Sequence, residues 1–242
     1  MGNQFKRTKL LFKRSGMEIL KKAHVIVFGV GGVGGYVAEA LARSGVQYLT
    51  LVDNDVVSET NINRQIIATY DSIGQSKVKV MKKRILSINP EAKVEVIEKF
   101  LLPEDIEKMT FDSYDYIADC VDTISTKIAI IQKAKLFNIP VISAMGAGNK
   151  MHPEMLEIAD IYKTSVDPLA KVIRTELRKR GIKDLKVIYS KEKPIEIDLN
   201  DTDIEIKEKS GRPAPGSNAF VPSAMGLIMA GEIIRDLIGY DK

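Results

Sequence analysis

The sequence predicts an α/β fold built on a doubly wound, mostly parallel sheet, and three observations support this prediction. Short apolar, β-branched runs alternate with stretches of helical periodicity over residues 1–143. A glycine-rich turn follows the first apolar run, and no internal repeat interrupts the alternation. Because β and α units that alternate at this length form parallel sheets with helices on both faces, we expect a Rossmann-like domain.

The first half of the chain predicts five strands. His24–Phe28 is a continuous apolar run, which is typical of a strand buried on both faces. A helix is expected next over 33–44, because Gly45 offers a C-terminal cap. The elements expected after it are a strand at 48–52, a basic helix through Val78, Met81, Ile85 and Ile88 that stops before Pro90, strands at 94–97, 116–118 and 139–142, and a helix over 126–137.

The pattern changes after residue 143, where shorter elements are expected. We interpret the chain as one domain over 1–242, with a nucleotide-binding half (1–143) and an elaboration for substrate and dimer contacts (144–242) that completes the same sheet. The second half has a run at 155–158 (MLEI) after a glycine-rich stretch. The elements expected there are strands at 186–190, 195–199 and 204–207, a hairpin turn at Asn200–Asp201, a basic helix over 168–180, a loop over 210–217 and a closing helix over 222–238.

Composition excludes several classes of protein. The 242 residues are 45% hydrophobic and 28% charged, which is ordinary for a globular chain and excludes wholesale disorder. One cysteine excludes a disulfide framework and a four-cysteine zinc site. Neither a secretion signal nor an uncharged apolar stretch of membrane length is present, so we expect a cytoplasmic protein with no integral membrane segment.

Positive charge is concentrated in two segments of a chain whose formal net charge is only +4. Residues 1–22 hold seven bases and one acid, and residues 163–193 hold ten bases and four acids. Such segments are either solvated helix faces or a surface for an anionic partner such as nucleic acid. Composition alone leaves both interpretations open.

A glycine-rich turn between a buried strand and a helix predicts a nucleotide site. Glycines allow a tight turn and let backbone N–H groups approach an anion at the positive end of the helix. Asp53 ends the second strand, where an acid can accept hydrogen bonds from ribose hydroxyls. The glycines concerned are Gly29, Gly31, Gly32 and Gly34.

Residues farther along the chain favour a nucleoside triphosphate over a dinucleotide. Arg64 and Lys77 can neutralise a triphosphate, which carries more charge than a bridged pyrophosphate. Asp122 follows the fourth strand and can hold magnesium on those phosphates. Asp55 and Asn61 complete the candidate nucleotide-binding set. The alternatives are surface charges for Arg64 and Lys77, and a helix N-cap for Asp122.

Five successive motifs resemble those of the ubiquitin-activating-type (ThiF/MoeB/HesA) adenylyltransferases. The resemblance implies binding of Mg-ATP and adenylation of a carboxylate, with the glycine loop on phosphate, Asp53 on ribose and Asp122 linked to magnesium. It also implies a homodimer in which an N-terminal arginine of one subunit enters the site of the other, and Arg7 stands at that place. Arg64 and Lys77 would contact the triphosphate. The motifs are residues 29–34 (GVGGVG), 53–55 (DND), 60–65 (TNINRQ), 74–77 (GQSK) and 119–122 (DCVD).

Within that superfamily the chain resembles the tRNA threonylcarbamoyladenosine dehydratase (TcdA/CsdL) family over nearly its whole length. The two Cys-x-x-Cys pairs common in the protein-activating branch are missing, and Cys120 is expected to be a small packing residue rather than a nucleophile. Lys13 replaces a glycine usual in the family's N-terminal motif. The segments that carry the resemblance are 5–11 (FKRTKLL), 144–150 (AMGAGNK), 158–169 (IADIYKTSVDPL), 187–194 (VIYSKEKP) and 216–226 (GSNAFVPSAMG).

This resemblance implies ATP-dependent dehydration of threonylcarbamoyladenosine next to the anticodon of tRNA, through adenylation of the threonyl carboxylate. Some relatives work with sulfur-mobilising proteins, and nothing in this sequence indicates such a partner. The alternatives are adenylation of the C-terminus of a ubiquitin-like sulfur-carrier protein, an NAD-dependent oxidoreductase and a non-catalytic nucleotide-binding scaffold. The oxidoreductase is supported by no residue beyond the glycine loop and Asp53.

Overall fold

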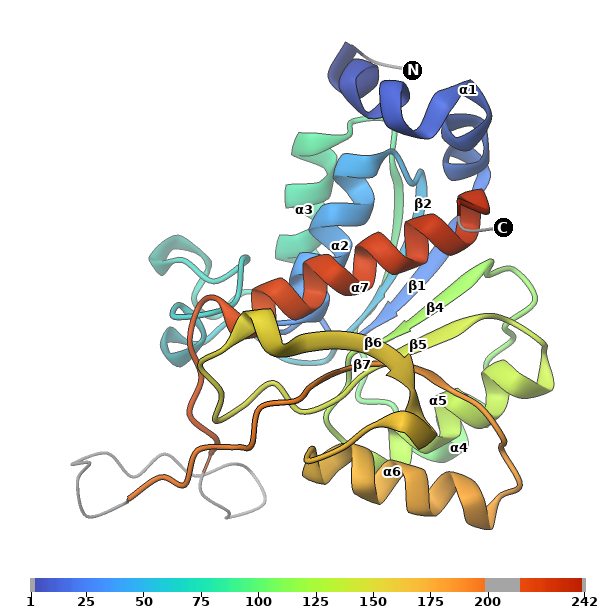
Figure 1. Ribbon diagram of the computed structural model, residues 1–242. Helices are drawn as coiled ribbons and strands as arrows, with labels where there is room; N and C mark the ends of the chain where they lie inside the picture. The colour runs from blue at the N-terminus through green and yellow to red at the C-terminus, as the bar shows by residue number, and fades with distance from the viewer. Residues whose placement is uncertain (1–2, 199–213, 241–242) are drawn as a thin grey trace.

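The computed structural model describes residues 3–198 and 214–240, and within them one seven-stranded sheet lies at the centre (Figure 1). The strand order is β3-β2-β1-β4-β5-β7-β6, and neighbouring strands are parallel except for β6 against β7. The prediction of a doubly wound, mostly parallel sheet is therefore confirmed. The strands are β1 (His24–Phe28), β2 (Tyr48–Val52), β3 (Lys93–Ile97), β4 (Tyr116–Asp119), β5 (Val141–Ala144), β6 (Leu156–Asp160) and β7 (Lys186–Ser190).

Helices cover both faces of the sheet. Side chains of α2, α3 and α7 pack into the core of one face, and those of α4, α5 and α6 pack into the core of the other (Figure 1). The helices are α1 (Lys6–Lys22), α2 (Gly34–Ser44), α3 (Lys77–Ile88), α4 (Pro103–Lys108), α5 (Ile124–Leu136), α6 (Pro168–Lys179) and α7 (Val221–Ile238), with short 3₁₀ turns at Asn3–Phe5, Glu59–Asn61, Tyr70–Ser72, Pro153–Met155 and Ile161–Lys163.

Strand β1 shows why a continuous apolar run marks the centre of this sheet. Val25 and Val27 enter the core on one face, whereas Ile26 and Phe28 enter the core on the other. All four side chains are fully buried, because successive residues of a strand point to opposite faces and helices cover both. The predicted strand is confirmed with its bounds unchanged.

The second half of the chain extends the same sheet rather than building a separate one. Strand β7 pairs in parallel with β5, and β6 pairs antiparallel with β7 at the edge. The expected helices over 168–180 and 222–238 are present as α6 and α7, within one residue at each end. The division of function at residue 143 stays a prediction.

One expected strand is wrong and two expected features lie outside the described residues. Residues 195–198 pair with no strand in the described part of the chain, and the hairpin partner predicted for them at 204–207 lies outside it. Instead a single backbone hydrogen bond of 2.7 Å joins the Ile195 amide to the carbonyl of Asn149. Leu199, the turn at Asn200–Asp201, the strand at 204–207 and the first part of the 210–217 loop are not described.

The N-terminal helix α1, which the periodicity did not predict, bends at one residue. Lys13 has φ 60° and ψ 177°, a conformation that glycine adopts readily and that other residues rarely do. The helix resumes after it and packs against α7. Position 13, where the family usually has glycine, therefore requires a backbone conformation that suits glycine.

None of the helices in the described residues is both long and apolar enough to cross a bilayer.

Candidate nucleotide-binding site at the carboxyl edge of the sheet

The glycine-rich loop after β1 is shaped by two very close backbone approaches. A Cβ at Gly34 would lie 1.8 Å from the carbonyl oxygen of Gly29, and a Cβ at Gly29 would lie 2.7 Å from that of Cys120. Gly29 also has φ +84°, which favours glycine. Helix α2 starts at Gly34 with no side-chain cap, and the Gly35 and Tyr36 amides already bond to the carbonyls of Gly31 and Val33. In the described residues the Gly34 amide forms no such bond and stays available to an anion.

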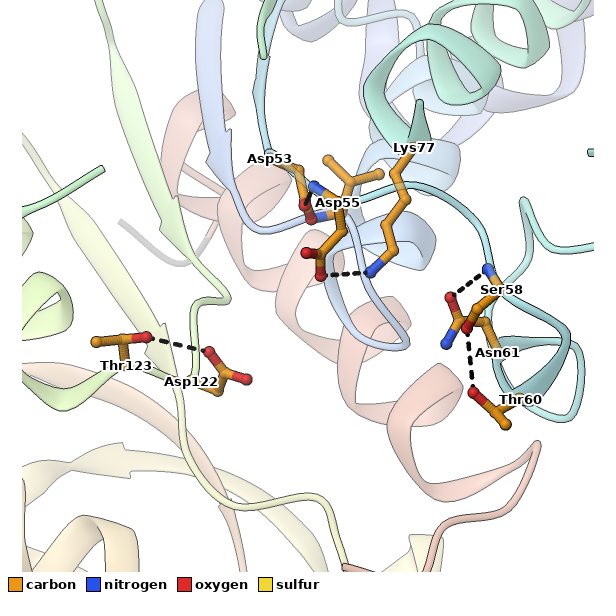
Figure 2. A network of polar contacts seen from close by, with 9 residues as sticks. Asp53, Asp55, Ser58, Thr60, Asn61, Lys77, Asp122 and Thr123 are labelled. Atoms are coloured by element: carbon orange, nitrogen blue, oxygen red, sulfur yellow. Dashed lines mark hydrogen bonds and ion pairs between the residues drawn. The ribbon is translucent and has the colours of Figure 1, made fainter. Parts of the chain in front are cut away.

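Asp53 joins this loop to the end of β2. Its Oδ2 accepts a hydrogen bond of 2.7 Å from the Val30 amide, and its Oδ1 accepts one of 2.9 Å from the Asp55 amide (Figure 2). Each carboxylate oxygen has a second lone pair, so both remain able to accept a hydroxyl donor. The carboxylate therefore fixes the loop and still offers acceptors at the place predicted for a ribose.

Lys77 lies beside Asp55 at the start of α3. Its Nζ is 3.1 Å from Asp55 Oδ2, and the Lys77 amide donates to the Asp55 carbonyl at 3.0 Å. The Lys77 side chain is 8% exposed, whereas that of Asp55 is 40% exposed. Figure 2 shows the two side chains turned toward each other below Asp53. The ammonium group is thus held at the site by a carboxylate that remains partly in solvent.

Arg64 packs against the glycine loop and keeps two sets of donors free. Its Cγ would lie 3.5 Å from a Cβ at Gly32. Its Nη1 donates to the Thr60 carbonyl and to Asn63 Oδ1, both at 2.9 Å, while Nε and Nη2 bond to nothing within the described residues. Burial lowers the pKa of the guanidinium, which nevertheless stays charged at neutral pH. The free N–H groups are suited to an anion.

Asn61 has a local structural role that the sequence did not indicate. It is buried, and its Oδ1 accepts a hydrogen bond of 3.1 Å from the Ser58 amide, which closes the turn before Arg64. Its Nδ2 is not used in that bond (Figure 2). Asn61 therefore orders the turn, and its predicted contact with a nucleotide stays a prediction.

Asp122 lies across from these residues, in the loop that follows β4. It is exposed, and its Oδ1 is 3.5 Å from the Thr123 hydroxyl, at the limit of a hydrogen bond. Figure 2 shows it apart from the Asp55–Lys77 pair. The residue at the N-cap of α5 is Thr123, and no side chain caps that helix. The alternative of Asp122 as a helix cap is therefore wrong.

Arg7 is not brought to the site within this chain. It is exposed in the first turn of α1, and in the described residues it forms no hydrogen bond or ion pair with the glycine loop. This placement fits an arginine whose predicted role is in another subunit.

Sequence reasoning missed a buried ionic network directly beneath this edge. Lys127 of α5 is fully buried and donates to Asp119 Oδ2 (2.9 Å), Ser143 Oγ (3.1 Å) and the Ala144 carbonyl (3.0 Å). The ammonium thus joins the ends of β4 and β5 to α5. A signal was present: an acid at the end of a buried strand requires a partner.

A second buried pair joins two of the segments that carry the family resemblance. Lys150 Nζ lies 2.9 Å from Asp167 Oδ2 and donates to the Gly146 carbonyl, and both side chains are buried. Asp167 also caps α6 by accepting from the Ala170 amide at 2.9 Å. The segment 158–169 therefore holds the loop after β5 through Asp167.

Cys120 behaves as the packing residue that the sequence predicts. Its sulfur is 3.8 Å from Met229 Sδ, and its Cβ faces Gly34. Burial and the neighbouring Asp119 raise the pKa of the thiol well above its usual range. A thiol kept protonated is a poor nucleophile.

Comparisons with known proteins identify the family of this chain. The ThiF family model matches residues 5–242. A tRNA threonylcarbamoyladenosine dehydratase of Bacillus subtilis is 48% identical over 98% of this chain and 96% of its own length.

Two crystal structures of tRNA N6-threonylcarbamoyladenosine dehydratase (TcdA) of Escherichia coli, one in complex with AMP and one with ATP, superpose with TM-scores of 0.88 and 0.87. Each is 30% identical and covers 98% of this chain and 95% of its own. The chain belongs to the ThiF family and, within it, to the tRNA threonylcarbamoyladenosine dehydratases.

Proposed function

We propose that this protein uses ATP to dehydrate N6-threonylcarbamoyladenosine in tRNA, by adenylating the threonyl carboxylate and letting the product cyclise. The observation that carries this proposal is the arrangement around the glycine loop. Arg64 offers free N–H donors there, Lys77 offers an ammonium group, and Asp53 offers acceptors. This set matches a triphosphate and a ribose, and the identity to named dehydratases supplies the substrate.

The proposed chemistry needs no nucleophile from the protein. The threonyl carboxylate attacks the α-phosphorus of ATP, which forms an acyl adenylate and releases pyrophosphate. The neighbouring carbamoyl group then attacks the activated carbonyl within the same molecule, and AMP leaves with the carboxylate oxygen. The net change is the loss of one water from the nucleoside. Proximity supplies what a covalent enzyme intermediate would otherwise provide, in agreement with a partly buried Cys120 whose thiol pKa is raised.

The protein contributes by positioning the nucleotide and by neutralising the charge of its triphosphate. Lys77 and Arg64 offset the negative charge of the triphosphate while pyrophosphate leaves, and the N-terminus of α2 contributes the Gly34 amide. Asp53 holds the loop in place for the ribose. Asp55 holds Lys77, and Asn61 orders the turn that carries Arg64.

We propose Asp122 as the residue that holds Mg²⁺. An exposed carboxylate at the carboxyl edge fits a cation that takes one or two protein ligands and completes its shell with phosphates and water. Among the described residues no three His, Cys, Asp or Glu side chains cluster as a metal cage, so the ion would come with the nucleotide. When bound, Mg²⁺ would neutralise phosphate charge.

Three further proposals complete the assignment. The protein acts in the cytoplasm, where its tRNA substrate is found. It forms a homodimer in which Arg7 of each subunit reaches the nucleotide of the other. The basic segments 1–22 and 163–193 contact the tRNA backbone, since binding of nucleic acid draws mainly on Lys and Arg.

The decisive experiment is mass spectrometry of tRNA nucleosides after incubation with the purified protein and Mg-ATP. We expect threonylcarbamoyladenosine to lose the mass of one water, only with ATP, and the loss to fall at least about a hundredfold in rate with Asp122→Ala or with a chelator. Asp112→Ala, an exposed acid before β4, is the matched control and should stay active. An unchanged nucleoside mass with intact ATP binding would instead favour adenylation of a carrier protein.

A further inference from the structure

Asn63 contacts two parts of the chain that are far apart in sequence. Its Oδ1 accepts a hydrogen bond of 2.9 Å from Arg64 Nη1, and its Nδ2 donates one of 3.1 Å to the carbonyl of Ser217. Ser217 lies 154 residues farther along the chain. One amide side chain therefore joins the loop of Arg64 to the segment that leads into α7.

The chemistry of the two partners fixes the orientation of this amide. A guanidinium only donates hydrogen bonds and a backbone carbonyl only accepts them. Turning the Asn63 amide over would set its NH₂ against Arg64 and its oxygen against the Ser217 carbonyl, so both contacts would be lost. Only one orientation satisfies both partners, and each contact supports the other.

We define residues 214–218 as the strap. Besides its contact with Asn63, the strap is anchored by the loop after β5. The Asn149 amide donates to the Gly216 carbonyl at 2.8 Å, and the Gly216 amide donates to Asn149 Oδ1 at 2.6 Å. Asn218 Nδ2 donates to the Lys150 carbonyl at 2.7 Å. The strap thus runs from the loop held by the Lys150–Asp167 pair to the side chain that holds Arg64.

The rest of the Arg64 side chain is held separately. Its aliphatic part packs on Gly32, beside Pro222 at the start of α7, whose Cβ would lie 3.3 Å from a Cβ at Gly32. Its Nη1 is the nitrogen that contacts Thr60 and Asn63, so these two residues set the plane of the guanidinium and hence the direction of Nε and Nη2. Removing Asn63 would leave Thr60 alone to hold that plane.

We propose that Asn63 is a positioning residue that couples the seating of the strap to the direction of Arg64, and thereby to binding of the ATP triphosphate. The inference rests on the proposed contact of Arg64 with phosphate. Such coupling is reciprocal: a seated strap strengthens ATP binding, and bound ATP stabilises the seated strap.

The test combines calorimetric titration with ATP and hydrogen–deuterium exchange. Asn63→Ala should weaken ATP binding about tenfold to a hundredfold, the effect of one hydrogen bond to a charged group, with little change in thermal stability because the side chain is exposed. In the unsubstituted protein ATP should slow exchange in 214–220, and in Asn63→Ala that protection should disappear. Equal protection in both proteins would overturn the coupling.

A second variant separates the coupling from simple loss of a contact. Asn149→Gly weakens the other anchor of the strap, because it removes the bond from the Gly216 amide to Asn149 Oδ1 but keeps the backbone bond to the Gly216 carbonyl. Glycine also accepts the φ of 56° that Asn149 adopts. We expect Asn149→Gly alone to weaken ATP binding. The double variant with Asn63→Ala should bind ATP no more weakly than Asn63→Ala alone. Additive losses would contradict the coupling.

Arg64→Ala distinguishes failure of this inference from failure of the proposed function. If Arg64→Ala leaves ATP binding unchanged, the assignment of Arg64 to phosphate is wrong. If Arg64→Ala weakens binding and Asn63→Ala does not, the assignment stands and the coupling through Asn63 is wrong.

Discussion

At the scale of single residues, Lys13 shows backbone strain that is open to measurement. A non-glycine residue at φ 60° and ψ 177° costs about 1–3 kcal/mol. We therefore expect Lys13→Gly to raise the free energy of unfolding by about 1–2 kcal/mol, although glycine is unfavourable in ordinary helix positions. Urea denaturation followed by circular dichroism measures this change.

The matched control for Lys13 is Lys9→Gly in the same helix. Lys9 is exposed and helical, so glycine there should lower the free energy of unfolding by about 1 kcal/mol. A rise in the free energy of unfolding for Lys13→Gly together with a fall for Lys9→Gly would identify backbone strain at Lys13. A loss of stability at both positions would contradict it.

The residues that sequence could identify are those whose chemistry depends on a local pattern. Gly29, Gly34 and Asp53 follow strands at fixed spacing, so their placement could be predicted, and the close approaches at the two glycines explain the spacing. Asn63 and Lys127 act through partners 154 and 16 residues away. Such contacts exist only after folding: the sequence signals that Asp119 requires a partner, but not that Lys127 supplies it.

At the scale of elements, the buried network of Lys127 fixes how β4, β5 and α5 meet beneath Asp122. Lys127→Met would leave Asp119 buried without its counter-charge, which costs about 3–5 kcal/mol. We expect urea unfolding to show a loss of that size. Lys127→Arg, which keeps the charge, should lose less.

Lys135→Met in the same helix is the control for Lys127→Met. Lys135 pairs with Asp184 at the surface, where ion pairs contribute about 0–1 kcal/mol. If Lys127→Met were no more destabilising than Lys135→Met, the network would not be what fixes this edge.

The elements that sequence predicted correctly are those in which periodicity and burial agree. The strands that pass through the centre of the sheet were found because both their faces are apolar, as in β1. Helix α4 spans six residues, too few to show periodicity, and α1 is interrupted at Lys13. The strand expected at 195–199 alternates apolar residues, yet its described residues 195–198 form no strand and leave Ile195 and Ile197 exposed, since alternation alone does not supply a strand partner.

At the scale of the whole molecule, α6 and the chain that follows it present bases to solvent. Lys179 and Arg180 pair with Glu176, and Arg178 lies over the ring of Tyr162 at 5.2 Å. Reversing Arg178, Lys179 and Arg180 to Glu should weaken tRNA binding. It should also reduce the slope of log affinity against log salt concentration by about one for each phosphate contact that is lost. ATP binding without tRNA should be unchanged.

Glutamates at positions 178–180 would also repel Glu176 in the same region, so a second set of charge-reversing substitutions is needed. Lys171→Glu with Lys183→Glu changes exposed residues that have no ion pair in the described part of the chain. Both sets should weaken tRNA binding in a filter-binding assay. Unchanged affinity in both would remove this surface from the tRNA interface.

The role of Arg7 also belongs to the scale of the whole molecule. In the described residues Arg7 does not contact the glycine loop of its own chain, so its predicted role can be tested only in a dimer. If Arg7 acts on the partner's nucleotide, Arg7→Ala and Arg64→Ala are each inactive, yet a mixed dimer contains one complete site. Random exchange makes about half of the dimers mixed, so activity should return to about a quarter of that of the unsubstituted protein. Sedimentation verifies that dimers form. If Arg7 instead acted within its own chain, every site in the mixture would lack one arginine and activity would stay absent.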